Sequence, residues 1–275
     1  MISPLIISII CFIIFVVSIS LFIYIKMYFS GLLLNTSNAK LKQDISEFIL
    51  SKSLVKDTLK KVKKSPFISR RNVIMSTIGK SNYLDGDILD TDYSITNNYI
   101  RNEFTELLDT ILNFFKEKFK KEKVMYLADI NNKKFSLPGF HVFDCNWIST
   151  FQVASVHKDL QYLKLAGVRP HTTNNENTNI LDIDIDIDID LDKTLSFTIC
   201  LEAQEGPHLY IYEKNIHEKD TLHSINYIPG HIVCHNGHDF HMIAPNKRVD
   251  QLVKRITVQG HIIYDKITKT HFIYW

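Results

Sequence analysis

The spacing of apolar residues changes twice along the chain and divides it into three parts. Residues 5–25 carry no charged side chain, and a helix over this run would span the roughly 30 Å core of a bilayer. Residues 28–122 place apolar side chains three and four positions apart, which predicts amphipathic helices. From residue 124 onward, short β-branched and aromatic runs bounded by Gly, Pro and Asn predict strands.

The first run is predicted to be a retained, single-pass transmembrane helix, so we expect membrane lipid as a partner through this anchor. No basic residue precedes the run, and no small-x-small cleavage site follows it, which disfavours a signal peptide. Lys26, Lys40 and Lys42 follow it, and the positive-inside tendency then places the C-terminal bulk in the cytoplasm. Abundant Ile, Asn and Lys suggest an AT-rich microbial or viral source; for a virus, the membrane would be that of the host or virion.

The middle part, residues 28–122, is expected to be a helical, Lys-rich region next to the membrane. A positive stretch lies at residues 60–64 and 70–71. Contact with anionic lipid headgroups and a merely solvated helix face both explain this stretch. The whole chain is nearly neutral, with 32 Lys and Arg against 30 Asp and Glu, so its charge predicts no nucleic-acid partner.

The last part, residues 124–275, contains at least seven short predicted strands with turn signals between them. This pattern favours a sandwich or a small open barrel, and a double-stranded β-helix (jelly roll) is the member of that class that suits an internal metal site. Residues 172–193 interrupt the pattern with an Asn/Thr-rich stretch and a strict Ile/Asp alternation, which we interpret as a low-complexity insertion. The repeat has no Gly-containing turn that could fold its carboxylates around an ion.

Candidate chemistry is concentrated in this last part, because all twelve histidines lie at or after residue 141. His157 and Asp159 are two residues apart, so both face one side of an extended strand and can reach one metal ion. A second histidine must then come from another strand, and residues 235, 238 and 241 are all histidines. The four cysteines are far apart and form no C-x-x-C pair, so neither a zinc ribbon nor a disulfide framework is indicated.

Two further residues suggest an anion site near the metal. Arg255 and Thr257 share one face of a predicted strand, and an arginine with a hydroxyl two residues on can hold a carboxylate. A surface ion pair is the alternative explanation for Arg255. Two histidines and a carboxylate are the ligand set that binds non-haem Fe(II) while leaving coordination positions open.

The chain resembles the Fe(II)/2-oxoglutarate-dependent oxygenases (prolyl-hydroxylase-like jelly rolls) in five segments of its last half. These are residues 137–143 (LPGFHVF), 155–162 (SVHKDLQY), 229–233 (PGHIV), 241–245 (HMIAP) and 255–261 (RITVQGH). The second histidine of that family is commonly followed by x-hydrophobic-x-Pro, which selects His241. The resemblance implies His157, Asp159 and His241 on Fe(II), with Arg255 and Thr257 on the distal carboxylate of 2-oxoglutarate.

The function implied by the resemblance is a membrane-anchored dioxygenase that hydroxylates an unknown substrate and converts 2-oxoglutarate to succinate and CO2, with ascorbate as an additional cofactor. Two alternatives remain open. A cupin-type metalloenzyme would not require Arg255, and a membrane-tethered scaffold with an inactive jelly roll would not turn over 2-oxoglutarate.

Overall fold

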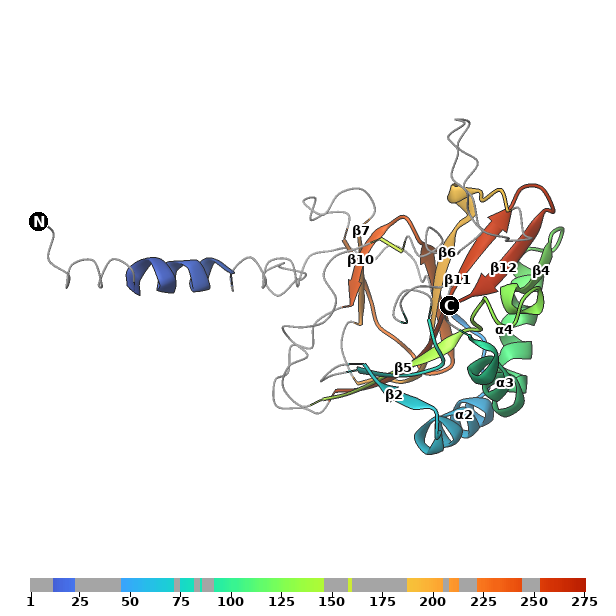
Figure 1. Cartoon of the computed structure of the whole chain (residues 1–275), viewed down its shortest axis with the longest axis horizontal. Coiled ribbons are helices and arrows are strands. Elements are labelled where there is room, and N and C mark those ends of the chain that lie inside the picture. The colour runs from blue at the N-terminus through green and yellow to red at the C-terminus, as the bar shows by residue number, and fades with distance from the viewer. Residues whose placement is uncertain are drawn as a thin grey trace, which may run out of the picture.

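The computed structural model describes residues 12–22, 46–71, 75–81, 85, 92–145, 158–159, 187–204, 208–212, 222–243 and 253–275. Residues 12–22 form a helix with exposed apolar side chains, drawn in dark blue in Figure 1. Within these described ranges, no helix is both long enough and apolar enough to cross a membrane. The rest of the predicted 5–25 span lies outside them.

Most strands belong to one large, mainly antiparallel sheet of nine strands (Figure 1). The order is β1-β9-β6-β11-β5-β3-β2, and β12 pairs with β11 and, in parallel, with β4. The strands are β1 (Ser46–Phe48), β2 (Ile68–Arg70), β3 (Met75–Ile78), β4 (Lys123–Tyr126), β5 (Gly139–Cys145), β6 (Leu195–Glu202), β9 (His231–Asn236), β11 (Val253–Asp265) and β12 (Thr270–Tyr274). The predicted β-rich character of the last part is therefore confirmed.

A small antiparallel sheet packs on one face of the large sheet. Its order is β10-β7-β8, with bounds β7 (Leu209–Tyr212), β8 (Leu222–Ile225) and β10 (Phe240–Ile243). Leu209 and Ile211 of the small sheet form one buried cluster with Cys200 and Val233 of the large sheet. The two sheets therefore enclose a common interior, which we call the intersheet space.

Helices cover the opposite face of the large sheet (Figure 1). They are α2 (Lys52–Lys64), α3 (Ser94–Glu103) and α4 (Thr105–Lys118), and two short 3-10 turns, η2 (Leu127–Asp129) and η4 (Leu191–Lys193), join strands elsewhere. Each helix buries residues at helical spacing, for example Leu107, Ile111 and Phe115 of α4. These side chains pack against Ile256 and Val258 of β11 in the main hydrophobic core.

The alternation of β11 therefore separates two environments. Ile256 and Val258 face the helices, so Arg255 and Thr257 must face the intersheet space. Side chains two residues apart in a strand point to the same side, and this is why Arg255 and Thr257 were predicted to share one face. The polar face of a central strand is thus buried between two sheets, where a polar group needs a partner.

Two predicted segments differ from the observed secondary structure. Within residues 28–122 the described residues form β1, β2 and β3 as well as the three helices, and these strands belong to the large sheet. At the end of the predicted insertion, Ile187 and Ile189 are buried beside Ile263 and Phe272, and η4 follows directly. Residues 187–193 are therefore part of the fold, because their alternation buries every Ile on one side.

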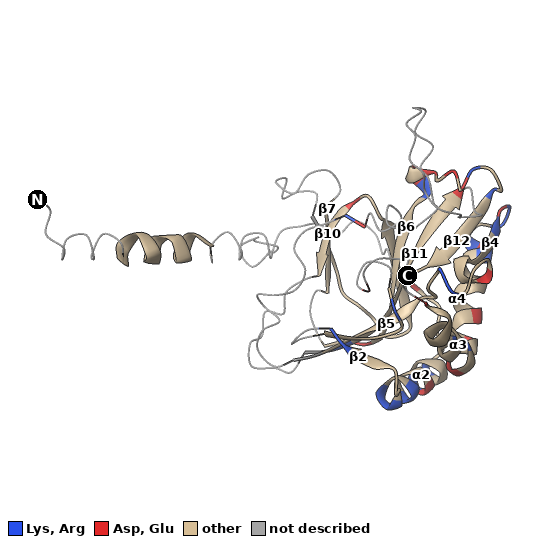
Figure 2. Ribbon diagram, in the orientation of Figure 1, with Lys and Arg blue, Asp and Glu red and all other residues tan. Residues whose placement is uncertain are grey.

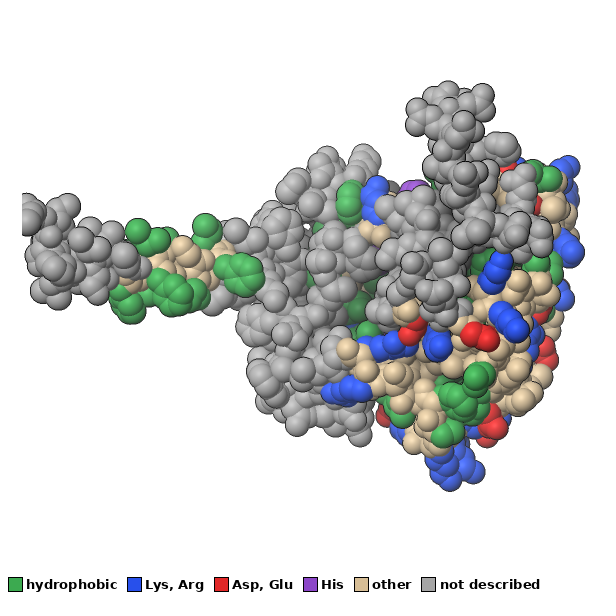
Figure 3. Space-filling view, viewed as in Figure 1, with side chains coloured by type: hydrophobic (Ala, Val, Ile, Leu, Met, Phe, Trp, Pro, Cys, Tyr) green, Lys and Arg blue, Asp and Glu red, His purple; other side chains and the backbone are tan. Residues whose placement is uncertain are grey.

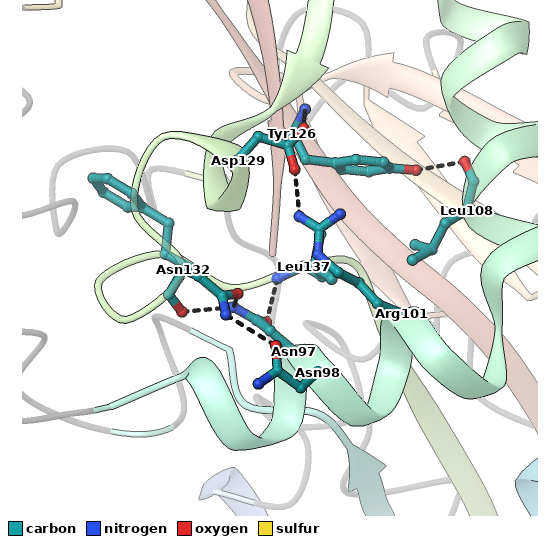
Figure 4. Close-up of polar contacts among 9 residues, drawn as sticks. Asn97, Asn98, Arg101, Leu108, Tyr126, Asp129, Asn132 and Leu137 are labelled. Carbon is teal, nitrogen blue, oxygen red and sulfur yellow. Dashed lines mark hydrogen bonds and ion pairs between the residues drawn. The ribbon is translucent and has the colours of Figure 1, made fainter.

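Asn97 ties α3 to the connection between β4 and β5 (Figure 4). Its Nδ2 donates to the backbone oxygens of Asn132 at 3.0 Å and Phe135 at 2.7 Å. Its Oδ1 accepts from the backbone nitrogen of Leu137 at 2.9 Å. One buried amide thus satisfies several backbone groups that have no place in the sheet.

Replacing Asn97 with alanine should reduce the free energy of unfolding by about 2–4 kcal/mol, because buried groups of Phe135 and Leu137 lose their partner. Urea unfolding followed by circular dichroism measures the change. Asn98→Ala is the matched control, since Asn98 is exposed on the same helix, and it should change stability by less than about 0.5 kcal/mol. Equal effects of the two variants would contradict this account of Asn97.

Glu122 joins the end of α4 to η4 and β12. Its carboxylate accepts from Lys193 Nζ at 2.9 Å and from His271 Nε2 at 2.5 Å. These two contacts, Lys193 foremost, lower the pKa of Glu122 from 4.5 to about 2. Because this pKa is lower in the folded protein, ionised Glu122 favours folding above about pH 4.5, and the contribution is lost as the pH falls toward 2.

The stability deficit of Glu122→Gln, relative to the unchanged protein, should therefore be largest at neutral pH and shrink as the pH falls below about 4.5. Urea unfolding at a series of pH values measures it. A deficit that is as large at pH values near 3 as at neutral pH would show that the charge of Glu122 is not what stabilises this junction.

Candidate metal centre

Two histidines and one aspartate meet in the interior of the protein. Ligand atoms of Asp159, His235 and His241 all lie within 4.8 Å of one another, and all three residues are buried. His241 Nε2 lies 3.2 Å from Asp159 Oδ2, and the rings of His235 and His241 are 4.4 Å apart. Among the described residues this is the one group of three or more potential metal ligands.

The backbone around Gly237 fixes these side chains. The amide of Asp159 donates to the Gly237 carbonyl at 2.8 Å, and the amide of Gly237 donates to the Thr194 carbonyl at 3.1 Å. A Cβ at position 237 would lie 3.3 Å from the Asp159 carbonyl oxygen and 3.4 Å from Ser196 Oγ. The missing side chain therefore allows the Asp159 segment to approach the turn that joins β9 to β10.

Both imidazoles are oriented for metal ligation through Nε2. His241 Nδ1 lies 2.9 Å from the Asp239 carbonyl oxygen, and His235 Nδ1 lies 3.0 Å from the Asn236 carbonyl oxygen. A carbonyl only accepts, so each Nδ1 must carry the proton and donate. Nε2 is then the ligand atom: in His235 it keeps its lone pair, and in His241 a metal ion would replace the proton that Nε2 donates to Asp159.

The electrostatics of the cluster suit a cation. Burial would raise the pKa of Asp159, but the hydrogen bond from His241 and the charge of His261 outweigh it, so the pKa is lowered and the carboxylate stays ionised. Burial lowers the pKa of His235 to about 3, which keeps this imidazole neutral. For His241, Asp159 more than offsets the effect of burial and raises the pKa. A divalent cation would compete with that proton.

The spacing of the rings fits one shared ion. With metal–nitrogen distances of about 2.1 Å and a right angle between the bonds, two imidazole centroids should lie about 4.5 Å apart. The observed separation between His235 and His241 is 4.4 Å. Asp159, His235 and His241 could therefore hold one octahedral ion and leave positions open for other ligands.

Of the three predicted metal ligands, Asp159 and His241 lie together in this cluster, and His157 lies outside the described residues. His235 was not selected from the sequence. His235 on β9 pairs with Ser196 on β6, and this register turns the His235 ring toward the intersheet space. The sequence does not reveal the register. Lys158 precedes Asp159 and Phe240 precedes His241 in the chain. The Nζ of Lys158 lies 4.4 Å from the centre of the Phe240 ring.

The two candidate third ligands can be separated by single substitutions. The structure predicts that His235→Ala loses Fe(II) binding, whereas the H-x-D motif predicts this loss for His157→Ala. Loss of a residue that only hydrogen-bonds to a ligand typically weakens metal binding by roughly 10–100-fold, so loss of a ligand itself should weaken Fe(II) binding by more than this. Anaerobic Fe(II) titration of both variants measures the difference, and unchanged affinity in His235→Ala would remove His235 from the site.

Arg255 and Thr257 line the same interior, near the middle of the large sheet. Arg255 is 3% exposed, its guanidinium lies 4.7 Å from the centre of the Phe143 ring, and its Nη1 donates to the His208 carbonyl at 3.1 Å. Thr257 pairs with His141 on one side and Cys200 on the other. Its Oγ1 is buried and has no hydrogen-bond partner within the described part of the chain.

Arg255 dominates the charge of this region. After burial, its positive charge is the main reason why the pKa of His141 falls to about 3 and that of His208 to about 4. The ring of Tyr227 stacks on His208 at 5.1 Å, and burial raises the pKa of Tyr227 although the charge of Arg255 opposes this. Thr257 pairs with Cys200, and Val233 lies two residues before His235 on β9; Cys200 and Val233 belong to one buried cluster, so the metal cluster and Arg255 face one shared interior.

No protein-family model matches the chain, and no curated protein matches it. Among solved structures, it is similar to a Pseudomonas putida prolyl-4-hydroxylase at 11% identity, over 80% of this chain and 91% of that one, with a TM-score of 0.36. It is also similar to the non-heme alpha-ketoglutarate-dependent epimerase SnoN from nogalamycin biosynthesis, at 9% identity over 79% of this chain and 78% of that one, with a TM-score of 0.39. A third similar structure is AviO1 from Streptomyces viridochromogenes, at 9% identity over 82% of this chain and 94% of that one, with a TM-score of 0.33. These TM-scores are low, so the function is argued from the site itself.

Proposed function

We propose that the chain is an Fe(II)- and 2-oxoglutarate-dependent dioxygenase that hydroxylates a substrate and releases succinate and CO2. The observation that carries this proposal is a buried two-histidine, one-carboxylate cluster that shares an interior with a buried arginine. We further propose that the two facing sheets form a double-stranded β-helix.

Asp159 and His241 are the proposed ligands that the sequence motif and the structure have in common, with His235 or His157 as the third. A two-histidine, one-carboxylate set leaves open positions on Fe(II), and the bound ion would supply O2 activation at those positions. The protein keeps the carboxylate ionised and the imidazole of His235 neutral. Both states are those that a metal ligand requires.

Arg255 and Thr257 are proposed to hold the distal carboxylate of 2-oxoglutarate. Arg255 is 3% exposed, and a buried guanidinium holds a carboxylate strongly because its planar fork can donate two parallel hydrogen bonds. Thr257 Oγ1 lies two residues along the same face and has no hydrogen-bond partner among the described residues, so it can donate to the same carboxylate. Leu209, Ile211 and Tyr227 exclude water from the surroundings.

The test is succinate release by the full-length protein with Fe(II), ascorbate and 2-oxoglutarate. Turnover that requires iron and disappears in His241→Ala supports the oxygenase. Iron-dependent turnover that does not require Arg255 would favour a cupin-type metalloenzyme. A folded protein that binds neither Fe(II) nor 2-oxoglutarate would indicate an inactive scaffold.

We also propose that residues 5–25 anchor the enzyme in a membrane, with its C-terminal domain in the cytoplasm. This proposal rests on the 21-residue run without a charged side chain and on the basic residues that follow it. Resistance to extraction by alkaline carbonate tests it. Complete release into the soluble fraction would contradict it.

A further inference from the structure

The outer side of α2 carries a stripe of lysines. At about 100° per residue, Lys52, Lys56, Lys60, Lys63 and Lys64 fall within an arc of about 120°. The buried residues of the helix lie on the opposite side and pack into the main core. Lys63 pairs with Glu202 at 2.9 Å, while Lys52, Lys56, Lys60 and Lys64 have no ion-pair partner within the described residues.

Exposed apolar side chains lie directly beyond the end of this stripe. Phe67 and Ile68 follow α2 and are 36% and 48% exposed. The Phe67 ring lies 4.4 Å from the ring of Tyr99 on α3, so the residue just before β2 contacts that helix. Ile95 is 67% exposed and lies four residues before Tyr99, hence on the same side of α3. We call Phe67, Ile68 and Ile95 together the apolar edge.

The charge of this surface is mainly positive, although Lys63 pairs with Glu202 and Arg71 pairs with Asp85. Residues 51–71 contain eight Lys or Arg and one acidic residue, Asp57, which pairs with Lys61 at 2.9 Å. The ribbon of α2 is mostly blue, the colour of Lys and Arg, in Figure 2, and Figure 3 shows basic side chains at the edge of the molecule near exposed apolar groups. The end of α4 is also Lys-rich, but Glu117 and Glu122 lie among its lysines.

We propose that the lysine stripe of α2 and the apolar edge form a surface that docks on anionic lipid headgroups. Each lysine near an anionic bilayer adds an electrostatic attraction of about fivefold in affinity, and exposed apolar residues beside the stripe insert at the acyl boundary. Long lysine side chains can reach the phosphates while their stems cover apolar surface. A nucleic acid would also attract the lysines, but it offers nothing that buries Ile68 and Ile95.

The surface is independent of the proposed oxygenase activity and of the predicted anchor. It would turn α2 and the start of β2 toward the membrane, and with them the helical side of the large sheet. The intersheet space lies on the other face of that sheet. The metal centre would therefore remain open to a substrate that arrives from the solvent side.

The experiment is residue-resolved lysine labelling of the full chain, reconstituted in phosphatidylcholine vesicles with or without about 30 mol% phosphatidylglycerol. An amine-reactive reagent and peptide mass spectrometry quantify each lysine. We expect labelling of Lys56, Lys60 and Lys64 to fall at least about threefold on the anionic vesicles and to recover at about 0.5 M salt. Lys120 and Lys121, exposed at the end of α4, should change little.

Variants make the test specific. Lys60→Glu with Lys64→Glu, or Phe67→Ser with Ile68→Ser, should remove the protection. The charge-matched control, Lys120→Glu with Lys121→Glu, should keep it. Equal labelling on the two vesicle types, or equal protection of Lys120 and Lys121, would overturn the proposal. Protection by a single-stranded RNA oligonucleotide but not by vesicles would replace it with a nucleic-acid surface.

Discussion

Replacing Asp159 or His241 with alanine is expected to weaken Fe(II) binding by more than about 100-fold and to abolish succinate release. Both residues belong to the proposed ligand set whichever histidine completes it. Loss of Asp159 also removes the single carboxylate of the cluster, so two neutral imidazoles would remain to bind a dication. Anaerobic Fe(II) titration by calorimetry measures the affinity, and a succinate assay measures turnover.

His238→Ala is the matched control for these variants. His238 lies in the turn between β9 and β10, three residues before His241, and is not part of the ligand cluster. We expect this variant to bind Fe(II) as tightly as the unchanged protein. Circular dichroism checks that each variant is folded. A folded Asp159→Ala protein with unchanged Fe(II) affinity would remove the metal site from its proposed place.

Arg255→Ala is expected to lower the affinity for 2-oxoglutarate by about 30-fold or more, because loss of a buried charged partner typically costs 2–5 kcal/mol. Fe(II) affinity should be nearly unchanged, since no ligand is altered. Arg255→Lys keeps the charge but loses the planar fork, so its loss should be intermediate. Thr257→Val should reduce the affinity by about tenfold, the value of one hydrogen bond.

Arg255 also contacts the Phe143 ring and the His208 carbonyl, so its removal affects packing as well. Isothermal titration with 2-oxoglutarate, beside an Fe(II) titration of the same sample, separates the two effects. A general loss of structure would weaken both ligands together. Unchanged 2-oxoglutarate affinity in a folded Arg255→Ala protein would exclude the proposed carboxylate clamp.

The alternation of side chains along a strand made the positions of Arg255 and Thr257 predictable from the sequence. Alternation places Arg255 and Thr257 on one face of a strand, and β11 has that geometry, with Ile256 and Val258 in the helix-facing core. The β-rich character of the last part was equally readable from its short apolar runs. These features are local, so a single sequence carries them.

Features that depend on distant pairing could not be predicted. The place of His235 follows from its register opposite Ser196, and that of Asp159 from its hydrogen bond to Gly237. The strands β1, β2 and β3 have only three or four residues, too few for a period to show in the sequence. They are defined by the strands beside them in the large sheet.

The most direct test of the central claim is an anaerobic absorbance titration of the Fe(II)-loaded protein with 2-oxoglutarate. Chelation of Fe(II) by the 2-oxo acid gives a metal-to-ligand charge-transfer band, which reports both partners at one centre. We predict a saturable band that is absent in His241→Ala and needs a much higher 2-oxoglutarate concentration in Arg255→Ala. A folded, Fe(II)-loaded protein that shows no band at any 2-oxoglutarate concentration would contradict the proposed function.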